Sequence, residues 1–241
     1  MPTLILSPRY SDDSNLLWKT AGQSNWHLCR LQSWEMPIDL EVRDPVFYGE
    51  PIFCDLVAGW LGYQLDTPSE FCLGKMPYEL IKRQVRYTTY FEAQKLTQPK
   101  FIKPPIHKRF AARVYQNPSL ELNHPADPQE PVLISDPVEF GIEIRSFILD
   151  RKIVTFSPYV GHWAARSNRW DLMPEEAPGF ENFVKKVVTS VGTSAAYVLD
   201  VGFIKNKGWA VIEVSPVSSS SIYGCDPKKV LEVLRRAKKN I

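Results

Sequence analysis

Two carboxylates in neighbouring apolar segments are the first candidates for chemistry. Asp200 lies within YVLDVGF, and Glu213 closes the run WAVIEVSP thirteen residues further on. The turn sequence KNKG between the two segments predicts a β-hairpin, so both carboxylates are expected on one face of two paired strands. Carboxylates are costly to bury unless a cation or a hydrogen-bond network satisfies them. The pair therefore indicates a bound cation or ligand, and the Ser215 hydroxyl, two residues after Glu213, adds a further oxygen on that face.

Two other stretches carry charged residues that could act with this pair. Lys103 lies in FIKP and Lys108 in the turn HKRF, whereas Glu143 and Arg145 alternate within the strand pattern FGIEIR. Considered alone, these features have ordinary explanations: exposed lysines beside prolines and a surface ion pair on an edge strand. The hairpin acids could likewise be incidental. The chain has no GxxxxGK[ST], GxGxxG or GxSxG motif, which excludes the common phosphate-binding loops and the nucleophile elbow.

The elements that must position these residues change in type along the chain. The first 75 residues alternate strands with helices, which is typical of an α/β layer, and an amphipathic helix is expected over 76–96. Strands dominate after that, with Asp150 and Arg151 as the turn of a hairpin. The pattern predicts two helices in the last part of the chain, one starting at Phe180 and one capped by Asp226.

Composition limits the class of protein. The chain has 241 residues, of which 44% are hydrophobic and 12% aromatic, which is enough for one large or two smaller domains with cores. A net charge of +2 gives no reason to expect a nucleic-acid or membrane surface. The four cysteines form no CxxC pair, and neither a signal peptide nor a stretch of ~20 uncharged apolar residues is found. A cytoplasmic protein is expected, and the sequence leaves a homodimer open.

Taken together and in this order, the charged stretches resemble the ATP-grasp superfamily, and within it a family long catalogued only as a domain of unknown function. That family typically shows FVKP, KxF, ExR after a hinge, DxG and VEVNP. Here these stretches are FIKP, KRF, EIR, DVG and IEVSP. The stretch YGEPIFCDLVAGWLGYQL also looks like the family's pre-grasp helix, and SSSIYGCDP looks like its close. The resemblance covers most of the chain, and its specificity lies in the combination of motifs.

The resemblance implies an α+β ATP-grasp fold, in which two α+β lobes clamp a nucleotide, preceded by a small α/β pre-grasp domain. The pre-grasp domain is expected over 1–75 and the ATP-grasp domain over 76–241. Within the latter, the first lobe is expected over 76–132 and the second over 133–241.

The resemblance also implies which residues would bind ATP. Lys103 would reach the α- and β-phosphates, and Lys108 would add a second cation there. The hinge backbone at Ile134 and Ser135 would bond the adenine. Glu143 would accept hydrogen bonds from the ribose hydroxyls.

The remaining site residues would act on charge and metal. Arg145 would stabilise phosphate charge or an acyl-phosphate intermediate, and Asp200 and Glu213 would hold one or two Mg²⁺ ions. The family usually has Asn where this chain has Ser215, whose hydroxyl is a weaker ligand with a shorter reach. It also has Gly where this chain has Ser221. These departures bear on the second metal more than on ATP binding.

The loop SPYVGHWAARSNRWDLMP would lie near the acceptor side of the cleft in such a protein. Tyr159, His162, Arg166 and Arg169 belong to it, and its arginines would suit an anionic acceptor. A surface loop anchored by its tryptophans is the alternative.

The function that the resemblance implies is an ATP-dependent ligase. It would activate the carboxylate of a small molecule or peptide as an acyl-phosphate, which an amine or a thiol would then attack. The alternatives are a degenerate ATP-grasp protein that binds nucleotide or a partner without ligation, and a phosphotransferase to a hydroxyl acceptor. ATP and Mg²⁺ are the expected cofactors.

Overall fold

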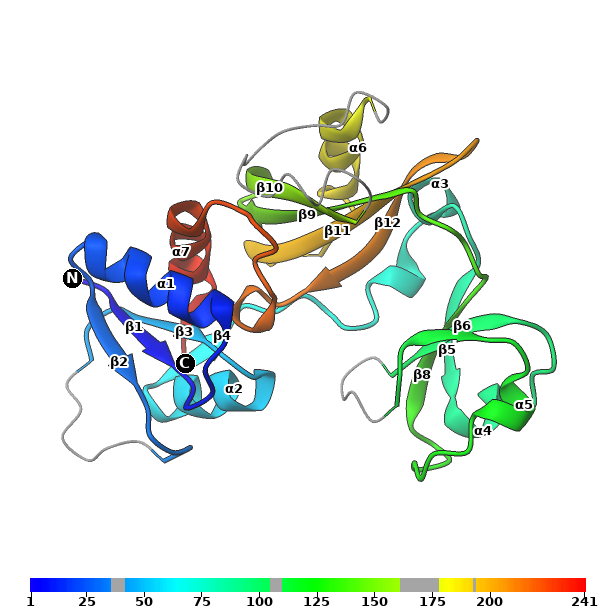
Figure 1. Cartoon of the computed structure of the whole chain (residues 1–241), viewed down its shortest axis with the longest axis horizontal. Helices are drawn as coiled ribbons and strands as arrows, with labels where there is room; N and C mark the ends of the chain where they lie inside the picture. Colours follow the sequence, from blue (N-terminus) through cyan, green and yellow to red (C-terminus); the bar gives the residue numbers. More distant parts are fainter. Residues whose placement is uncertain (36–41, 105–109, 161–177, 193) are drawn as a thin grey trace.

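The chain folds into three parts that together form an arch (Figure 1). The computed structural model describes residues 1–35, 42–104, 110–160, 178–192 and 194–241. Both chain ends lie in or beside the N-terminal domain, a large lobe forms the top of the arch, and a small lobe hangs from its far side. Across the described ranges, no helix is both long enough and apolar enough to cross a membrane.

The N-terminal domain is built on a three-stranded parallel sheet. The sheet has the order β2-β1-β3, with bounds His27–Arg30, Thr3–Leu6 and Pro45–Tyr48. Helix α1 (Asp12–Gln23) starts with a capping box between Ser11 and Ser14, and α2 (Pro51–Trp60) starts with a proline at its first position. These local signals are those that the sequence pattern predicted for both helices.

The C-terminal end of the chain returns to this domain. Strand β13 (Lys238–Asn240) pairs with β4 (Tyr63–Leu65), and α7 (Pro227–Arg236) packs against α1 and β3. Asp44 accepts hydrogen bonds from Arg235 and Lys238, at 2.6 and 2.9 Å. The expected division into residues 1–75 and 76–241 is therefore crossed by the last helix and strand.

The small lobe is a four-stranded antiparallel sheet with two short helices. Its strand order is β5-β8-β6-β7, with bounds Val85–Thr89, Pro131–Ser135, Lys100–Lys103 and Arg113–Tyr115. Helices α4 (Tyr90–Ala93) and α5 (Pro118–Glu121) cover it. Since β8 ends at Ser135, this lobe extends past the boundary expected at residue 132.

The single helix expected over 76–96 is wrong. Helix α3 (Tyr78–Ile81) ends after one turn because Lys82 adopts a left-handed conformation with a φ of 55°. The residues that follow, VRYTT, are β-branched or aromatic and pair with β8 as strand β5. The chain therefore crosses from the large lobe, where α3 contacts β12, to the small lobe within this segment.

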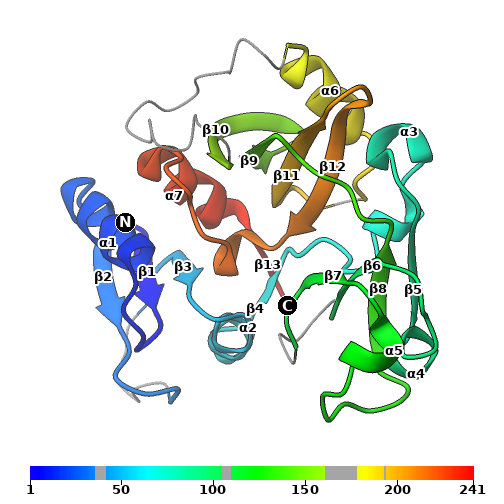
Figure 2. The same ribbon diagram turned by 45° about the vertical axis from the view of Figure 1, so that its right-hand side comes forward.

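The large lobe is a four-stranded antiparallel sheet covered on one face by α6 (Figure 2). Its order is β10-β9-β11-β12, with bounds Lys152–Val160, Ile142–Leu149, Ala196–Ile204 and Gly208–Ser215. Helices α6 (Phe180–Val187) and α3 and the 3₁₀ turn η1 (Leu73–Lys75) lie against one core, and α7 and the turn η3 (Val217–Ser219) lie against another. Part of the second face is left over for a site.

Candidate active site

A cavity of about 420 Å³ lies between the two lobes and is called the interlobe cavity below. Its charged walls bring together five residues that the sequence predicted, namely Lys103, Glu143, Arg145, Asp200 and Glu213. Its apolar walls come from both lobes and from the connection between them: Leu73, Phe101, Leu133, Val138, Phe140 and Ile212. The volume and the mixture of an apolar wall with a few charged groups suit a small-molecule ligand.

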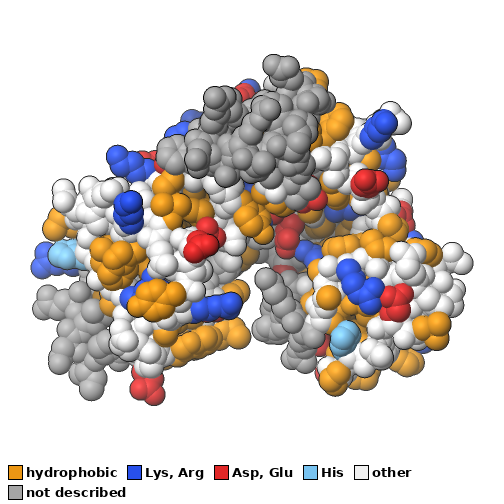
Figure 3. All heavy atoms as spheres, viewed as in Figure 1, with side chains coloured by type: hydrophobic (Ala, Val, Ile, Leu, Met, Phe, Trp, Pro, Cys, Tyr) orange, Lys and Arg blue, Asp and Glu red, His pale blue; other side chains and the backbone are white. Residues whose placement is uncertain are grey.

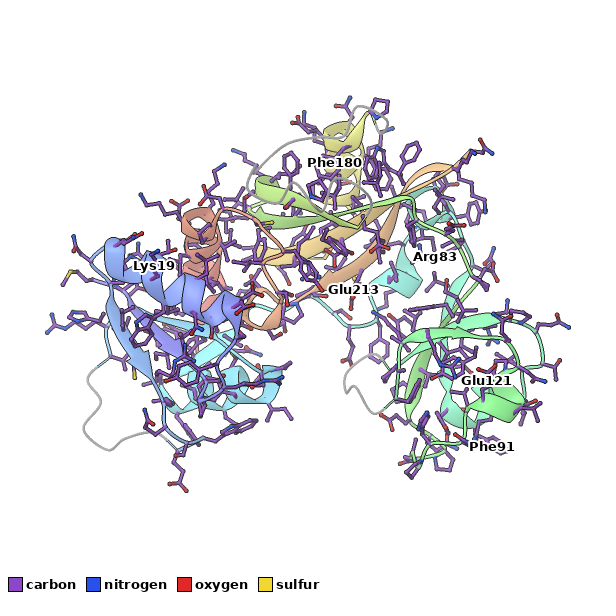
Figure 4. The ribbon with its side chains drawn as sticks, viewed as in Figure 1. Lys19, Arg83, Phe91, Glu121, Phe180 and Glu213 are labelled. Carbon is purple, nitrogen blue, oxygen red and sulfur yellow. The ribbon has the colours of Figure 1, made fainter. Side chains whose placement is uncertain are left out.

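A β-bulge places the two predicted carboxylates on the same face. Ile204 to Val201 pair with Gly208 to Val211 in regular register, but Asp200 pairs with Glu213, so Ile212 is an extra residue in β12. Without the bulge Glu213 would share the face of Val211, which belongs to the core under α6. Figure 4 shows Glu213 on the face of the sheet opposite Phe180.

Arg145 and Asp200 form a buried bidentate salt bridge. The two residues face each other on β9 and β11, and Arg145 Nε and Nη2 donate to the two Asp200 oxygens at 2.9 and 2.6 Å. Arg145 Nη1 donates to the carbonyl of Ser221 at 2.7 Å. Burial raises the pKa of the Asp200 carboxyl, and the bonds from Arg145 oppose that rise. The pair therefore forms a fixed, charged floor of the cavity.

Ser221 does not need to be glycine in this fold. It is absent from the residues with positive φ, whereas its neighbours Tyr223 and Gly224 have φ values of 44° and 80°. The main chain at Ser221 is thus compatible with any side chain. Its contribution to the site is the carbonyl that binds Arg145, so the replacement of the family's usual glycine leaves this contact in place.

Lys103 and Glu213 approach each other across the cavity. Lys103 ends β6 of the small lobe, and its Nζ lies 2.7 Å from Glu213 Oε1 at the end of β12. The Lys103 side chain is 17% exposed and that of Glu213 is 42% exposed. One cation and one anion from different lobes thus point to the same place.

Glu143 belongs to an aromatic cluster that the sequence indicated only in part. Burial raises the pKa of the Glu143 carboxyl, the hydrogen bond from the Tyr159 hydroxyl opposes that rise, and the charge of Asp200 adds to it. The Tyr159 ring stacks on Tyr223 at 4.7 Å, and the Arg145 guanidinium lies 4.4 Å from the centre of the Tyr223 ring. Tyr223 has a strained positive φ and lines the cavity, yet no sequence motif identified it.

Arg83 lines the cavity at the junction of the two lobes (Figure 4). Its side chain is buried, and it donates to Ser135 Oγ at 3.1 Å, to the carbonyl of Ile81 at 2.9 Å and to that of Val211 at 2.7 Å. Burial lowers the pKa of Arg83 to about 10. The sequence analysis missed this residue because it placed the segment in a helix.

The connection that carries the chain back to the large lobe starts after the expected hinge residues. Ile134 and Ser135 lie in β8, which is paired with β5 and with β6 at both positions. Their main chain is therefore engaged by the sheet, and the Ile134 side chain is buried in the small-lobe core. The connection itself is residues 136–141, of which Asp136, Val138 and Phe140 line the cavity.

The predicted metal ligands are near one another but are not a preformed metal site. Within the described ranges, no group of three or more His, Cys, Asp and Glu side chains could hold a metal ion. Both Asp200 oxygens accept from Arg145, so Glu213 is the carboxylate with free surface. Ser215 lies beside Glu213 in an adjoining cavity. Lys108, His162, Arg166 and Arg169 lie outside the described residues.

Comparison with known proteins places this geometry in a family. Residues 80–233, more than half of the chain, match the family model for an ATP-grasp domain, family 2 of its clade. The chain belongs to this ATP-grasp family, as its motifs predicted. No curated protein sequence matches it significantly.

Solved structures show the same fold at low sequence identity. A RimK domain protein ATP-grasp from Sphaerobacter thermophilus superposes with a TM-score of 0.57 and 11% identity, covering 97% of this chain and 99% of that one. The D-alanine–D-alanine ligase of Bacillus anthracis gives 0.55 and 13%, covering 98% and 97%. A RiPP-associated ATP-grasp ligase of Chryseobacterium gregarium, in complex with ADP and a leader and core peptide, gives 0.50 and 11%, covering all of both chains. The α+β ATP-grasp fold expected from the sequence is confirmed.

Proposed function

We propose that this protein is an ATP-dependent ligase that activates a substrate carboxylate as an acyl-phosphate for attack by a nucleophile. The observation that carries the proposal is the interlobe cavity, where Lys103, Glu143, Arg145, Asp200 and Glu213 meet between the lobes of an ATP-grasp fold. The solved structures with this fold that are described above include ligases for a small molecule and for a peptide. The carboxylate substrate is accordingly a small molecule or a peptide.

The residues of the cavity divide the binding of ATP between them. The apolar side chains of the two lobes and of residues 136–141 enclose the adenine, and Glu143 accepts from the ribose hydroxyls. Lys103 binds the phosphates as a point charge. Arg145 holds the Asp200 carboxylate in a fixed orientation at the phosphate end of the cavity.

The oxygen donors of the site fit Mg²⁺. Glu213 already holds the Lys103 ammonium at 2.7 Å, which shows that its carboxylate is oriented toward a cation in the cavity. Glu213, Asp200 and the Ser215 hydroxyl are the residues that would hold the ion, with water completing the octahedron. Bound Mg²⁺ would neutralise phosphate charge and orient the γ-phosphate for transfer.

An ATP-binding protein without ligase activity is the second candidate. It is favoured by the Arg145–Asp200 salt bridge, which uses both oxygens of one proposed metal ligand. Calorimetric titration of ATP with and without Mg²⁺ tests what the two candidates share. Magnesium-dependent binding together with ADP release in the presence of carboxylates and amines supports the ligase. Binding without ADP release supports the second candidate, and no binding at millimolar ATP contradicts both.

A further inference from the structure

A second cavity adjoins the interlobe cavity on the side of the N-terminal domain. It has a volume of about 460 Å³ and is walled by α2, by residues 67–73 and by the end of β12. The two cavities share Leu73, Leu133, Lys103 and Glu213, so they meet at the Lys103–Glu213 salt bridge. Figure 3 shows the surface hollowed between the N-terminal domain and the small lobe. This neighbour is called the acidic cavity, for the reason that follows.

The charged side chains of the acidic cavity are mostly carboxylates. Asp55 comes from α2, Glu70 from the segment after β4, and Glu213 from β12, against the single cation Lys103. Lys103 and Glu213 neutralise each other. Within the part of the chain that the structure describes, neither Asp55 nor Glu70 has a salt-bridge partner. The wall therefore keeps two uncompensated negative charges.

Hydroxyl groups make up most of the remaining polar wall. They belong to Thr67, Ser69, Tyr87, Ser215 and Ser219. A hydroxyl oxygen can accept a hydrogen bond from an N–H donor, and an ammonium group has three such donors and no acceptor. Of the described residues in this wall, none is an arginine or a histidine. The wall attracts a cation and repels a carboxylate or a phosphate.

We propose that the acidic cavity binds the nucleophile of the ligation as a primary ammonium group, held by Asp55, Glu70 and the neighbouring hydroxyls. The inference rests on the ligase function proposed above, and it narrows the nucleophile to an amine. A thiol nucleophile acts as its thiolate, and two nearby carboxylates would disfavour that anion. The position beside the Lys103–Glu213 salt bridge brings the amine to the end of the interlobe cavity where the phosphates are proposed to lie.

The reaction balances with this nucleophile. The bound ammonium gives up one proton, and the nitrogen lone pair then forms a C–N bond with the carbonyl carbon of the acyl-phosphate. The C–O bond to phosphate breaks, and its electron pair leaves with the phosphate. The nitrogen loses a second proton to give the amide. One of the two protons ends on the released phosphate, and the other passes to solvent by way of a cavity carboxylate.

Cys72 provides a readout for binding that does not depend on activity. It lines the acidic cavity and is half-buried, and burial raises the pKa of its thiol to about 11. Its alkylation by iodoacetamide is therefore slow, and a ligand that fills the cavity slows it further. The rate would be followed by peptide mass spectrometry on the full chain at constant ionic strength, with Cys29, which is outside the cavity, as internal reference. The probes are n-butylammonium, n-butanol and butyrate, which differ mainly in charge.

We expect n-butylammonium to slow the alkylation of Cys72 severalfold and to leave Cys29 unchanged, whereas n-butanol and butyrate have no effect. Asp55→Asn and Glu70→Gln should each raise the half-protecting n-butylammonium concentration by about two- to fivefold. Glu79→Gln, an exposed carboxylate on α3 away from the cavity wall, should not. Equal protection by n-butanol, or stronger protection by butyrate, overturns the proposal.

The experiment contains no ATP, so its result is separate from the test of the ligase function. If ATP binds with Mg²⁺ and n-butylammonium fails to protect Cys72, the ligase proposal stands and the amine assignment is wrong. If n-butylammonium protects Cys72 but ATP does not bind, the cavity holds a cation without being a nucleophile site, and the inference is overturned.

Discussion

Lys103 Nζ lies 2.7 Å from Glu213 Oε1, and this salt bridge joins the small lobe to the large lobe across the interlobe cavity. A partly exposed ion pair of this kind contributes at most about 1 kcal/mol. The charges of a nucleotide phosphate and of its metal ion are larger than those of the two side chains. The proposed ligand can therefore replace the salt bridge, with Lys103 turning to phosphate and Glu213 to the metal.

Replacement of Lys103 by alanine tests this exchange. We expect Lys103→Ala to weaken ATP binding in the presence of Mg²⁺ by about ten- to a hundredfold, because a charge-assisted contact is lost. Lys95→Ala is the matched control, since Lys95 forms an equally short salt bridge with Glu92 on the surface of the same lobe. Isothermal calorimetry measures both. Equal affinities for Lys103→Ala and the control would mean that Lys103 does not bind phosphate.

Arg83 links the two lobes at their junction, and its loss should be measured as stability. Arg83→Met leaves the carbonyls of Ile81 and Val211 without a donor inside the protein. We expect the free energy of unfolding to fall by about 2–3 kcal/mol in urea denaturation. Arg86→Met, an exposed arginine three residues on, should change it by less than about 0.5 kcal/mol. A similar loss in both variants would contradict the role given to Arg83.

The fold could be predicted from the sequence where local signals were complete. The hairpin around KNKG, the proline that starts α2 and the Asp226 cap of α7 all occur in the structure. The motif order predicted the superfamily, because each motif supplies one charged residue to the same cavity. The expectation that Asp200 and Glu213 share a face also proved correct.

The reason for that shared face could not be predicted. A regular hairpin would have put the two acids on opposite faces, and only the extra residue in β12 aligns them. The segment 76–96 failed for a similar reason, because a left-handed Lys82 and pairing with β8 override its helical periodicity. The acidic cavity involves α2, residues 67–73 and β12, which lie far apart in sequence.

Gly202, the glycine of the DVG motif, is needed for close packing of the connection between the lobes. A Cβ at this position would lie 2.7 Å from Phe140 Cγ and 2.9 Å from Ile212 Cδ1, and both residues line the interlobe cavity. Gly202→Ala should displace Phe140, cost about 1–3 kcal/mol of stability and weaken ATP binding. Gly141→Ala has no atom closer than 4.0 Å and should change neither quantity. Unaltered calorimetric affinity and urea midpoint in Gly202→Ala would contradict this packing role.

The proposed ribose contact of Glu143 predicts a pH dependence. Burial raises the pKa of Glu143 above its usual 4.5, and only the ionised carboxylate accepts from both ribose hydroxyls. Protonation on acidification therefore competes with binding, so affinity should be full at neutral pH and fall as the pH drops through a midpoint above 4.5. Adenosine is the probe, since it has no phosphate to titrate.

Two variants separate this titration from other acid effects. Glu143→Gln should bind adenosine more weakly at neutral pH and lose the pH dependence, whereas Glu139→Gln, an exposed carboxylate in the same connection, should keep it. Circular dichroism at each pH checks that the chain stays folded. A pH profile that is unchanged in Glu143→Gln would remove Glu143 from the binding site.

Ser215 is the last point at which the chain departs from its family, and it makes a prediction about metal. Its hydroxyl lies beside Glu213 but reaches less far than the asparagine oxygen that the family usually has. Ser215→Asn should therefore lower the Mg²⁺ concentration that half-saturates ATP binding, because a direct oxygen ligand replaces a water. Ser215→Ala should raise it or leave it unchanged, since it removes the hydroxyl. Calorimetry at fixed ATP over a Mg²⁺ series measures both variants, and an unchanged half-saturating concentration in Ser215→Asn would show that position 215 is not a ligand.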